Sequence, residues 1–145
     1  MSGIRVCIDT NVFLNVLNKE TNHYQYSKGV LLAVERRQID AVIPTLVISE
    51  ILTGFYIEKR KNDAEQFLLG VVAEENIDVI PLTIDIAISS AKVRSKTGLK
   101  LPDSMVVATA VEMHAGYIVS NDDNFPRTYE GVKTVNSNEF MRLLK

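Results

Sequence analysis

The sequence predicts a single α/β domain, a three-layer α/β/α sandwich around a central, mainly parallel sheet of four to five strands. Short runs rich in Val and Ile alternate with longer stretches of helical periodicity, which is the order that α/β layer folds require. The short runs are apolar at nearly every position, as parallel strands buried on both faces are. No repeat, low-complexity segment or linker interrupts the alternation, so we expect one domain over residues 1–145.

The positions of strands and helices follow from the two hydrophobic periods. Strands are expected at five apolar runs, 4–8, 41–43, 77–80, 117–119 and 132–135. Helices are expected over the segments between and after them, 11–18, 22–37, 45–60, 62–75, 83–97, 102–115 and 137–144. Residues that interrupt helices mark several of the boundaries, namely Pro44, Gly98, Pro102 and Gly116.

The charge balance excludes a protein that coats nucleic acid nonspecifically. That mode needs many Lys and Arg residues along the phosphates, whereas the net charge here is −2. Any contact with phosphates therefore has to be local. Arg94, Lys96 and Lys100 lie in a segment without acids, 92–100, shortly before Asp103. They either contact phosphates or form the solvated end of a helix.

The single cysteine and the absence of targeting signals indicate a cytoplasmic protein. Cys7 lies in the apolar run 4–8, where a buried, unreactive thiol is expected, and one cysteine forms no disulfide framework. The first twenty residues lack the basic and apolar segments of a signal peptide. No apolar run is long enough to cross a bilayer, so we expect no membrane association.

Several other chemistries lack the residues they need. Only His23 and His114 are present, far apart, which argues against a zinc site or a Ser-His triad. His114 follows an apolar helix, where it is expected to compensate the helix dipole or to lie on the surface. The glycines form neither GxGxxG nor a P-loop, so nucleotide cofactors held by such motifs are not expected.

Acidic residues directly follow two of the predicted strands. Asp9 ends the first run, and Asp122 and Asp123 come shortly after the run 117–119. Ligand sites of open α/β sheets lie beyond the carboxyl ends of the strands, so neighbouring strands would bring these carboxylates together. Each has an ordinary alternative, because Asp9 could cap the next helix and Asn121–Asn124 could be a polar turn.

Glu50 lies on a helix face that is not polar. On a helical projection it borders the apolar stripe of Val47, Ile51 and Phe55. An acid rarely lies beside such a stripe without a partner, which could be an Arg or Lys elsewhere in the chain or a bound cation.

Asp103 occupies the start of a helix that is apolar or small nearly all round. Pro102 fits the first helical position, and Asp103 in the first turn is stabilised by the helix dipole. The rest of this helix, 105–115, has the pattern of a buried helix, so Asp103 is expected to be half-buried at its inner end.

Together these carboxylates predict a divalent-cation site. At about 5 Å and an effective dielectric constant near 20, each like-charged pair repels by roughly 3 kcal/mol. Several such pairs would rival the stability of a whole domain, so a cation has to offset them. Oxygen ligands select Mg²⁺ or Mn²⁺, which activate water and bind phosphate oxygens. The chemistry indicated is hydrolysis of a phosphodiester.

The order of these motifs resembles that of PIN-domain ribonucleases, in particular the short VapC-type toxins of toxin–antitoxin pairs. The resemblance rests on the ordered set and spans nearly the whole chain, although no single motif is specific. Its parts are Asp9-Thr10-Asn11 after a strand, Ser49-Glu50 in the third helix, Leu101-Pro102-Asp103 opening a buried helix, and Ser120-Asn121-Asp122 with Phe125.

The resemblance implies metal-dependent endonucleolytic cleavage of RNA, a homodimer, and inhibition by a small antitoxin protein. It implies that the acidic quartet is Asp9, Glu50, Asp103 and Asp122, and that the first, third and fourth hold Mg²⁺ or Mn²⁺. Supporting roles would fall to three residues, Asn11, Ser120 and Asp123. Asp123 also remains an alternative to Asp122. Contacts with the RNA backbone would fall to Arg94, Lys96 and Lys100.

Two other functions remain open at this point. A magnesium-dependent phosphohydrolase would use Asp9 as nucleophile and Asp122 and Asp123 as metal ligands, although such enzymes usually need a second acid where this chain has Asn11. A binding module without catalysis would use aromatic residues at an interface, with Tyr24, Tyr26 and Phe55 as candidates.

Overall fold

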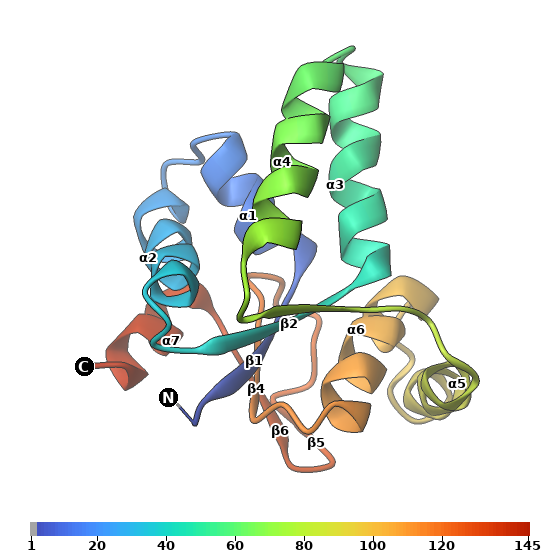
Figure 1. Ribbon diagram of the computed structural model, residues 1–145. Coiled ribbons are helices and arrows are strands. Elements are labelled where there is room, and N and C mark those ends of the chain that lie inside the picture. The colour runs from blue at the N-terminus through green and yellow to red at the C-terminus, as the bar shows by residue number, and fades with distance from the viewer. Residues whose placement is uncertain (1–2) are drawn as a thin grey trace.

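The computed structural model describes residues 3–145 as a central sheet with helices on both faces (Figure 1). In this part of the chain the sheet has six strands in the order β3-β2-β1-β4-β6-β5. Every neighbouring pair is parallel except β5 and β6. The strands are β1 Arg5–Ile8, β2 Asp40–Pro44, β3 Ile77–Ile80, β4 Tyr117–Val119, β5 Thr128–Tyr129 and β6 Val132–Val135. The predicted three-layer fold is confirmed.

The five predicted strands are present, and the sixth, β5, was not predicted. It has two residues and pairs antiparallel with β6 at the edge of the sheet. The connecting turn has positive φ at both central residues, 47° at Glu130 and 82° at Gly131, as a tight type I′ hairpin turn requires. Two residues are too few to show the alternation that identifies a strand in a sequence.

The seven predicted helices are found in the described chain, and several end earlier than predicted. They are α1 Thr10–Leu17, α2 Tyr24–Glu35, α3 Thr45–Ile57, α4 Lys61–Ala73, α5 Ile84–Thr97, α6 Leu101–Glu112 and α7 Ser137–Leu143. Arg37, Lys59 and His114, just past three of these ends, adopt left-handed φ values of 56° to 58°. Glycine usually marks such ends. Because none stands there, the sequence offered no stop signal.

The two faces of β1 show how the layers are arranged. Ile8 lies among side chains of α1, α2 and α4, whereas the thiol of Cys7 lies 3.8 Å from the backbone carbonyl of Val106 in α6. The ring of Phe140 from α7 packs against Tyr117 of β4. Figure 1 shows α1, α2 and α7 on one side of the sheet and α6, with α5 outside it, on the other.

Two expectations about single features are confirmed. Cys7 is fully buried, and this burial raises the pKa of its thiol well above the usual range, so the thiol stays protonated. Helix α6 is buried on most sides, from Ser104 to Ala110. None of the helices in residues 3–145 is long and apolar enough to cross a membrane.

Candidate active site

Asp9 is buried at the junction of β1 and α1 and accepts three hydrogen bonds. The Thr10 backbone N–H donates to Oδ1 at 2.8 Å, and Oδ2 accepts from the Ser120 hydroxyl at 2.8 Å and the Asn11 amide at 2.9 Å. The side chain is the N-cap of α1. The capping role that the sequence left open for Asp9 is therefore present. Its second oxygen, Oδ2, is held by Ser120, which directly follows β4.

The pairing of β1 with β4 brings this second strand end to Asp9. The register aligns Ile8 with Val119, so the next residues along, Asp9 and Ser120, lie side by side. The Ser120 hydroxyl also accepts from the Asn11 amide at 3.1 Å. The predicted meeting of the two strand ends is confirmed.

Asp122 and Asp123 differ in what they face. The Asp122 carboxylate accepts from the Asn124 N–H at 2.9 Å, so the polar turn that the sequence allowed is also present. The charge of Asp122 raises the pKa of Asp103 on α6, which places the two carboxylates near each other. Asp123 is exposed and is not among the causes of the raised pKa values of Asp9 and Asp103. The geometry favours Asp122 as the acid of this cluster.

Asp103 is half-buried in the first turn of α6, as expected, although the helix begins one residue earlier than predicted, at Leu101. Burial is the largest cause of the raised pKa of its carboxyl group, followed by the charges of Asp122 and Glu50. The Lys100 ammonium acts in the opposite direction.

Glu50 lies at the border of the apolar stripe, as predicted. Val47, Ile51 and Phe55 are buried, and Glu50 beside them is exposed. Thr10 Oγ1 donates to Glu50 Oε1 at 2.7 Å, and no Lys or Arg within residues 3–145 forms an ion pair with Glu50. Thr10 directly follows Asp9. Sequence reasoning missed this role, since nothing local links residues forty positions apart.

The cluster carries uncompensated negative charge. The pKa of Asp9 is raised to about 6: burial is the largest cause, the charges of Asp103 and Glu50 raise it as well, and hydrogen bonds from Ser120 and Thr10 act in the opposite direction. Within residues 3–145, no Lys or Arg forms an ion pair with Asp9, Glu50, Asp103 or Asp122. Such an arrangement suits a ligand with positive charge.

A family model described as PIN domain matches residues 6–131, most of the chain. The chain belongs to the PIN-domain family. No curated protein matches the sequence.

Solved structures share this PIN fold along almost their whole length. A toxin–antitoxin complex from Klebsiella pneumoniae is 21% identical, with a TM-score of 0.68 over 88% of this chain and 94% of that chain. VapBC2 from Rickettsia felis, bound to a promoter DNA fragment, is 15% identical, with a TM-score of 0.70 over 92% and 98%. VapC20 from Mycobacterium tuberculosis, a sarcin-ricin loop cleaving toxin, is 12% identical, with a TM-score of 0.66 over 88% and 98%. At these identities the similarity shows the fold.

The donors of this PIN domain fit a hard divalent cation by type and charge, because all are carboxylate oxygens. In the described residues, no three His, Cys, Asp or Glu side chains are grouped closely enough to hold one ion together. Mg²⁺ commonly takes only one or two carboxylates and keeps several waters, so it does not need such a group. Glu50 is exposed and Asp122 partly so, which leaves both free to rotate toward an ion.

The three basic residues predicted to contact RNA have different neighbours in the PIN domain. Arg94 donates to the Leu99 carbonyl at 2.6 Å, just past the end of α5. Lys96 lies 4.0 Å from the Glu130 carboxylate. Lys100 is exposed at the start of α6 and lowers the pKa of Asp103, so it is the one beside the acids.

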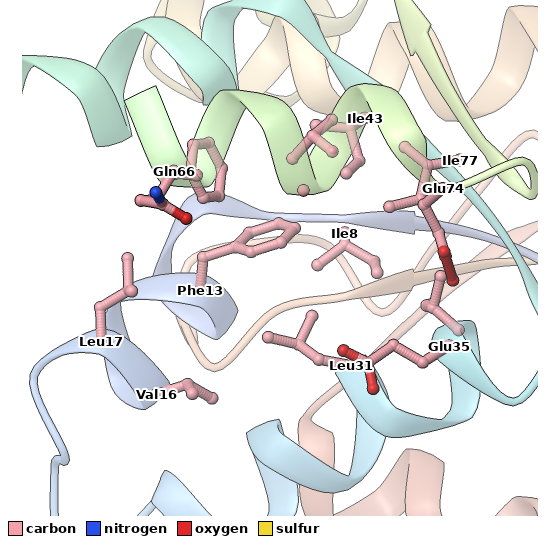
Figure 2. A pocket seen from close by; sticks show the side chains of 14 residues that line it. Ile8, Phe13, Val16, Leu17, Leu31, Glu35, Ile43, Gln66, Glu74 and Ile77 are labelled. Carbon is pink, nitrogen blue, oxygen red and sulfur yellow. The ribbon is translucent and has the colours of Figure 1, made fainter. Parts of the chain in front are cut away.

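A separate hollow of about 250 Å³ lies between α1, α2, α4 and the sheet of the PIN domain. Figure 2 shows Ile8 and Phe13 in its interior, with Leu31 from α2 beside them. Glu35 of α2 and Glu74 at the end of α4 also line it. In the described chain neither carboxylate is ion-paired. The hollow thus combines an apolar floor with two free acids.

The burial of Asp9 predicts that the metal-free protein loses stability as the pH rises. The folded pKa is about 6, whereas the unfolded chain keeps a value of about 4, so the folded state binds the proton more tightly. This contribution is complete below about pH 4 and is lost as the pH rises through about 6. Between pH 4.5 and 8 the wild type should lose roughly 2 kcal/mol of unfolding free energy through the titration of Asp9. Asp9→Asn has no such carboxyl group and should not show this loss.

Urea unfolding in EDTA, followed by circular dichroism, measures these slopes. Asp123→Asn removes an exposed acid next to Asp122 and should keep the wild-type dependence of the unfolding free energy on pH. Equal slopes for wild type and Asp9→Asn would show that burial of Asp9 does not perturb its titration.

Proposed function

We propose that this PIN domain is a divalent-metal-dependent endoribonuclease and the toxin of a cytoplasmic toxin–antitoxin pair. The observation that carries the proposal is the meeting of Asp9, Glu50, Asp103 and Asp122 at the carboxyl edge of the sheet without an ion-pair partner in the described chain. RNA as substrate is supported by the shared fold with VapC20, which cleaves the sarcin-ricin loop.

The acids divide into two roles by their exposure and hydrogen bonds. Asp9, Asp103 and Asp122 hold Mg²⁺ or Mn²⁺, directly or through water. When bound, the ion supplies positive charge to the scissile phosphate and acidity to the attacking water. Glu50 is exposed and held through one oxygen by Thr10, which leaves the other to accept a proton from that water.

Three further residues act through or beside these acids. Asn11 and Ser120 hold the Asp9 carboxylate in place by the two hydrogen bonds to Oδ2. Lys100, at the exposed start of α6, is placed to contact a phosphate of the RNA backbone next to Asp103. Arg94 and Lys96 already have partners and contribute less.

The phosphohydrolase alternative is poorly supported by the geometry of Asp9. A nucleophilic carboxylate needs an oxygen exposed to substrate, whereas both oxygens of Asp9 accept hydrogen bonds and the residue is 5% exposed.

The binding-module alternative loses one of its aromatic residues. Phe55 is buried against Phe67 and beneath Arg60, so the expectation that it lies at an interface is wrong.

We place the antitoxin in the hollow between α1, α2 and α4. The apolar floor fits an apolar side chain, and Glu35 and Glu74 fit basic residues next to it. The proposed occupant is a segment of the antitoxin that carries an apolar residue flanked by Arg or Lys. Solved complexes of the same fold with antitoxins support a protein partner.

We place the homodimer contact on the free edge of the sheet, at β3. Tyr56, Leu82 and Ile84 are exposed there at 54%, 53% and 76%. Two shallow apolar hollows beside them share Thr45 and Ser49, which makes this surface continuous from α3 to the start of α5. A stable dimer buries roughly 800 Å² on each partner, so a contact here would extend over this whole surface.

The nuclease proposal predicts that RNA cleavage depends on metal and on Asp103. A mixed RNA pool should be cleaved internally with Mg²⁺ or Mn²⁺ and left intact with EDTA. Asp103→Asn should lower the rate by at least roughly 100-fold, because a lost metal ligand removes several kcal/mol of transition-state stabilisation. Asp123→Asn should stay within a few-fold of wild type. Cleavage that survives EDTA, or that Asp103→Asn leaves unchanged, would refute the nuclease assignment.

The antitoxin proposal predicts that filling the hollow blocks the partner. Gly70 lines the hollow, and a Cβ added to it would meet no other atom within 4 Å, so Gly70→Trp should fold and occupy the hollow. The affinity of this variant for the proposed antitoxin, measured by calorimetry, should fall by at least about tenfold. Leu69→Trp, on the exposed side of the same helix, is the matched control. Wild-type affinity in Gly70→Trp would place the antitoxin elsewhere.

The dimer proposal predicts a mass of twice 16.2 kDa for the free protein in light scattering after size-exclusion chromatography. Ile84→Lys should give the monomer mass, because it places a charge in the apolar contact. Leu143→Lys changes another exposed apolar residue, on α7, and should stay dimeric. A dimer that tolerates Ile84→Lys would exclude this surface.

A further inference from the structure

Asn121, directly before Asp122, has a side chain whose hydrogen-bonding capacity is completely used. Its Nδ2 donates to Asn15 Oδ1 at 2.7 Å and to the Ser27 hydroxyl at 3.2 Å. Its Oδ1 accepts from the backbone N–H and from the hydroxyl of Ser137, both at 3.0 Å. An amide side chain can make no more than about four such bonds, and a surface loop residue rarely makes all of them.

Backbone groups determine the orientation of every amide in this network. The Ser137 N–H can only donate, so the atom that faces it must be Asn121 Oδ1. Asn121 Nδ2 then faces Asn15, which must present its own Oδ1. The backbone N–H of Asn121 donates to Asn11 Oδ1 at 2.9 Å, which leaves Asn11 Nδ2 for the Asp9 carboxylate. One consistent chain of hydrogen bonds therefore runs from α7 to Asp9.

The partners of Asn121 belong to three helices and are among the least exposed polar residues. Asn15 of α1 is 4% exposed, and Ser27 of α2 and Ser137 of α7 are 0% exposed. Buried polar groups are costly unless they are bonded, so the three helices are held to this amide. Helix α7 lies beyond residues 6–131, the part that matches the PIN family, yet it contacts the loop of the acids through Asn121.

The Asp122 side chain has little of its own to hold it. Its hydrogen bond is to the Asn124 N–H within the same turn, which does not set the direction of the turn. The backbone around it is anchored by the Asp122 N–H, which donates to the Ser120 hydroxyl at 3.1 Å, and by Asn121. Of these anchors, the Asn121 side chain is the one that bonds to three helices, whereas the Asn121 N–H bonds to α1 alone, through Asn11.

We propose that Asn121 is a positioning residue for the divalent ion, which holds the Asp122 turn against α1, α2 and α7 so that the Asp122 carboxylate faces Asp103. Asn121 itself does not touch the ion or the RNA. This inference rests on the proposed metal-dependent function, and it adds α7 to the parts of the chain that the site depends on.

Mn²⁺ binding to the purified, RNA-free protein tests this role without reference to activity. In titration calorimetry Asn121→Ala should bind Mn²⁺ about tenfold to 100-fold more weakly than wild type, as loss of a group that orients a ligand does. Asn76→Ala is the matched control. Asn76 also anchors a loop by its amide, donating to the carbonyls of Val34 and Ile39 at 2.6 and 2.8 Å, but it lies before β3. Both variants should unfold at lower urea concentration, and only Asn121→Ala should lose Mn²⁺ affinity.

A second variant covers the case in which Asn121→Ala does not fold. Ser137→Ala removes the hydroxyl donor and keeps the backbone N–H bond to Asn121, so a smaller loss of Mn²⁺ affinity is expected, roughly threefold. If Asn121→Ala folds and binds Mn²⁺ as tightly as wild type, the positioning role is overturned and the metal-dependent function is not. If Asn121→Ala does not fold, an unchanged Mn²⁺ affinity of Ser137→Ala overturns the positioning role in the same way. Absence of Mn²⁺ binding by the wild type overturns the metal-dependent function and this inference with it.

Discussion

The parallel pairing of β1 with β4 is the constraint on which the site depends. Alignment of Ile8 with Val119 makes Asp9 and Ser120 neighbours, and the same register leads the chain on into α1 at one strand end and into the Asp122 turn at the other. A slip of one residue would turn Ile8 away from α1, α2 and α4 and separate Asp9 from the Ser120 hydroxyl. The core residues therefore fix the register that the acids require.

Burial, more than mutual repulsion, determines the electrostatics of this site. Repulsion between carboxylates was the reason to expect a cation, yet burial is the largest cause of the raised pKa of both Asp9 and Asp103. The charges contribute less because Glu50 is exposed to solvent, which screens its charge. Three hydrogen bonds to Asp9 offset part of its burial. The main effect of a bound cation would therefore be to compensate the lost hydration of the buried Asp9 carboxylate. Reducing the repulsion between neighbouring acids would be the smaller effect.

The sequence predicted the elements and the strand ends because both depend on local patterns. Parallel strands are continuous apolar runs, and an acid that follows such a run lies at the edge where the ends meet. The contact of Thr10 with Glu50 and the bonds of Asn121 to Ser27 and Ser137 join residues far apart in the chain. Such contacts depend on how helices pack. The separation of Lys96 from Lys100 has the same origin, because helical rotation and the turn between α5 and α6 direct them to different neighbours.

Helix α1 links two of the surfaces to which we assign function, the acidic site and the apolar hollow. Asp9 caps its amino end and Thr10 holds Glu50, while Phe13, Val16 and Leu17 further along the same helix line the apolar hollow. Eight residues of helix span about 12 Å, so a peptide seated in the hollow begins little more than one helix length from the acids. An extended segment covers that distance in about four residues. A partner bound in the hollow therefore needs only a short continuation to place a basic side chain beside carboxylates that form no ion pair in the described chain.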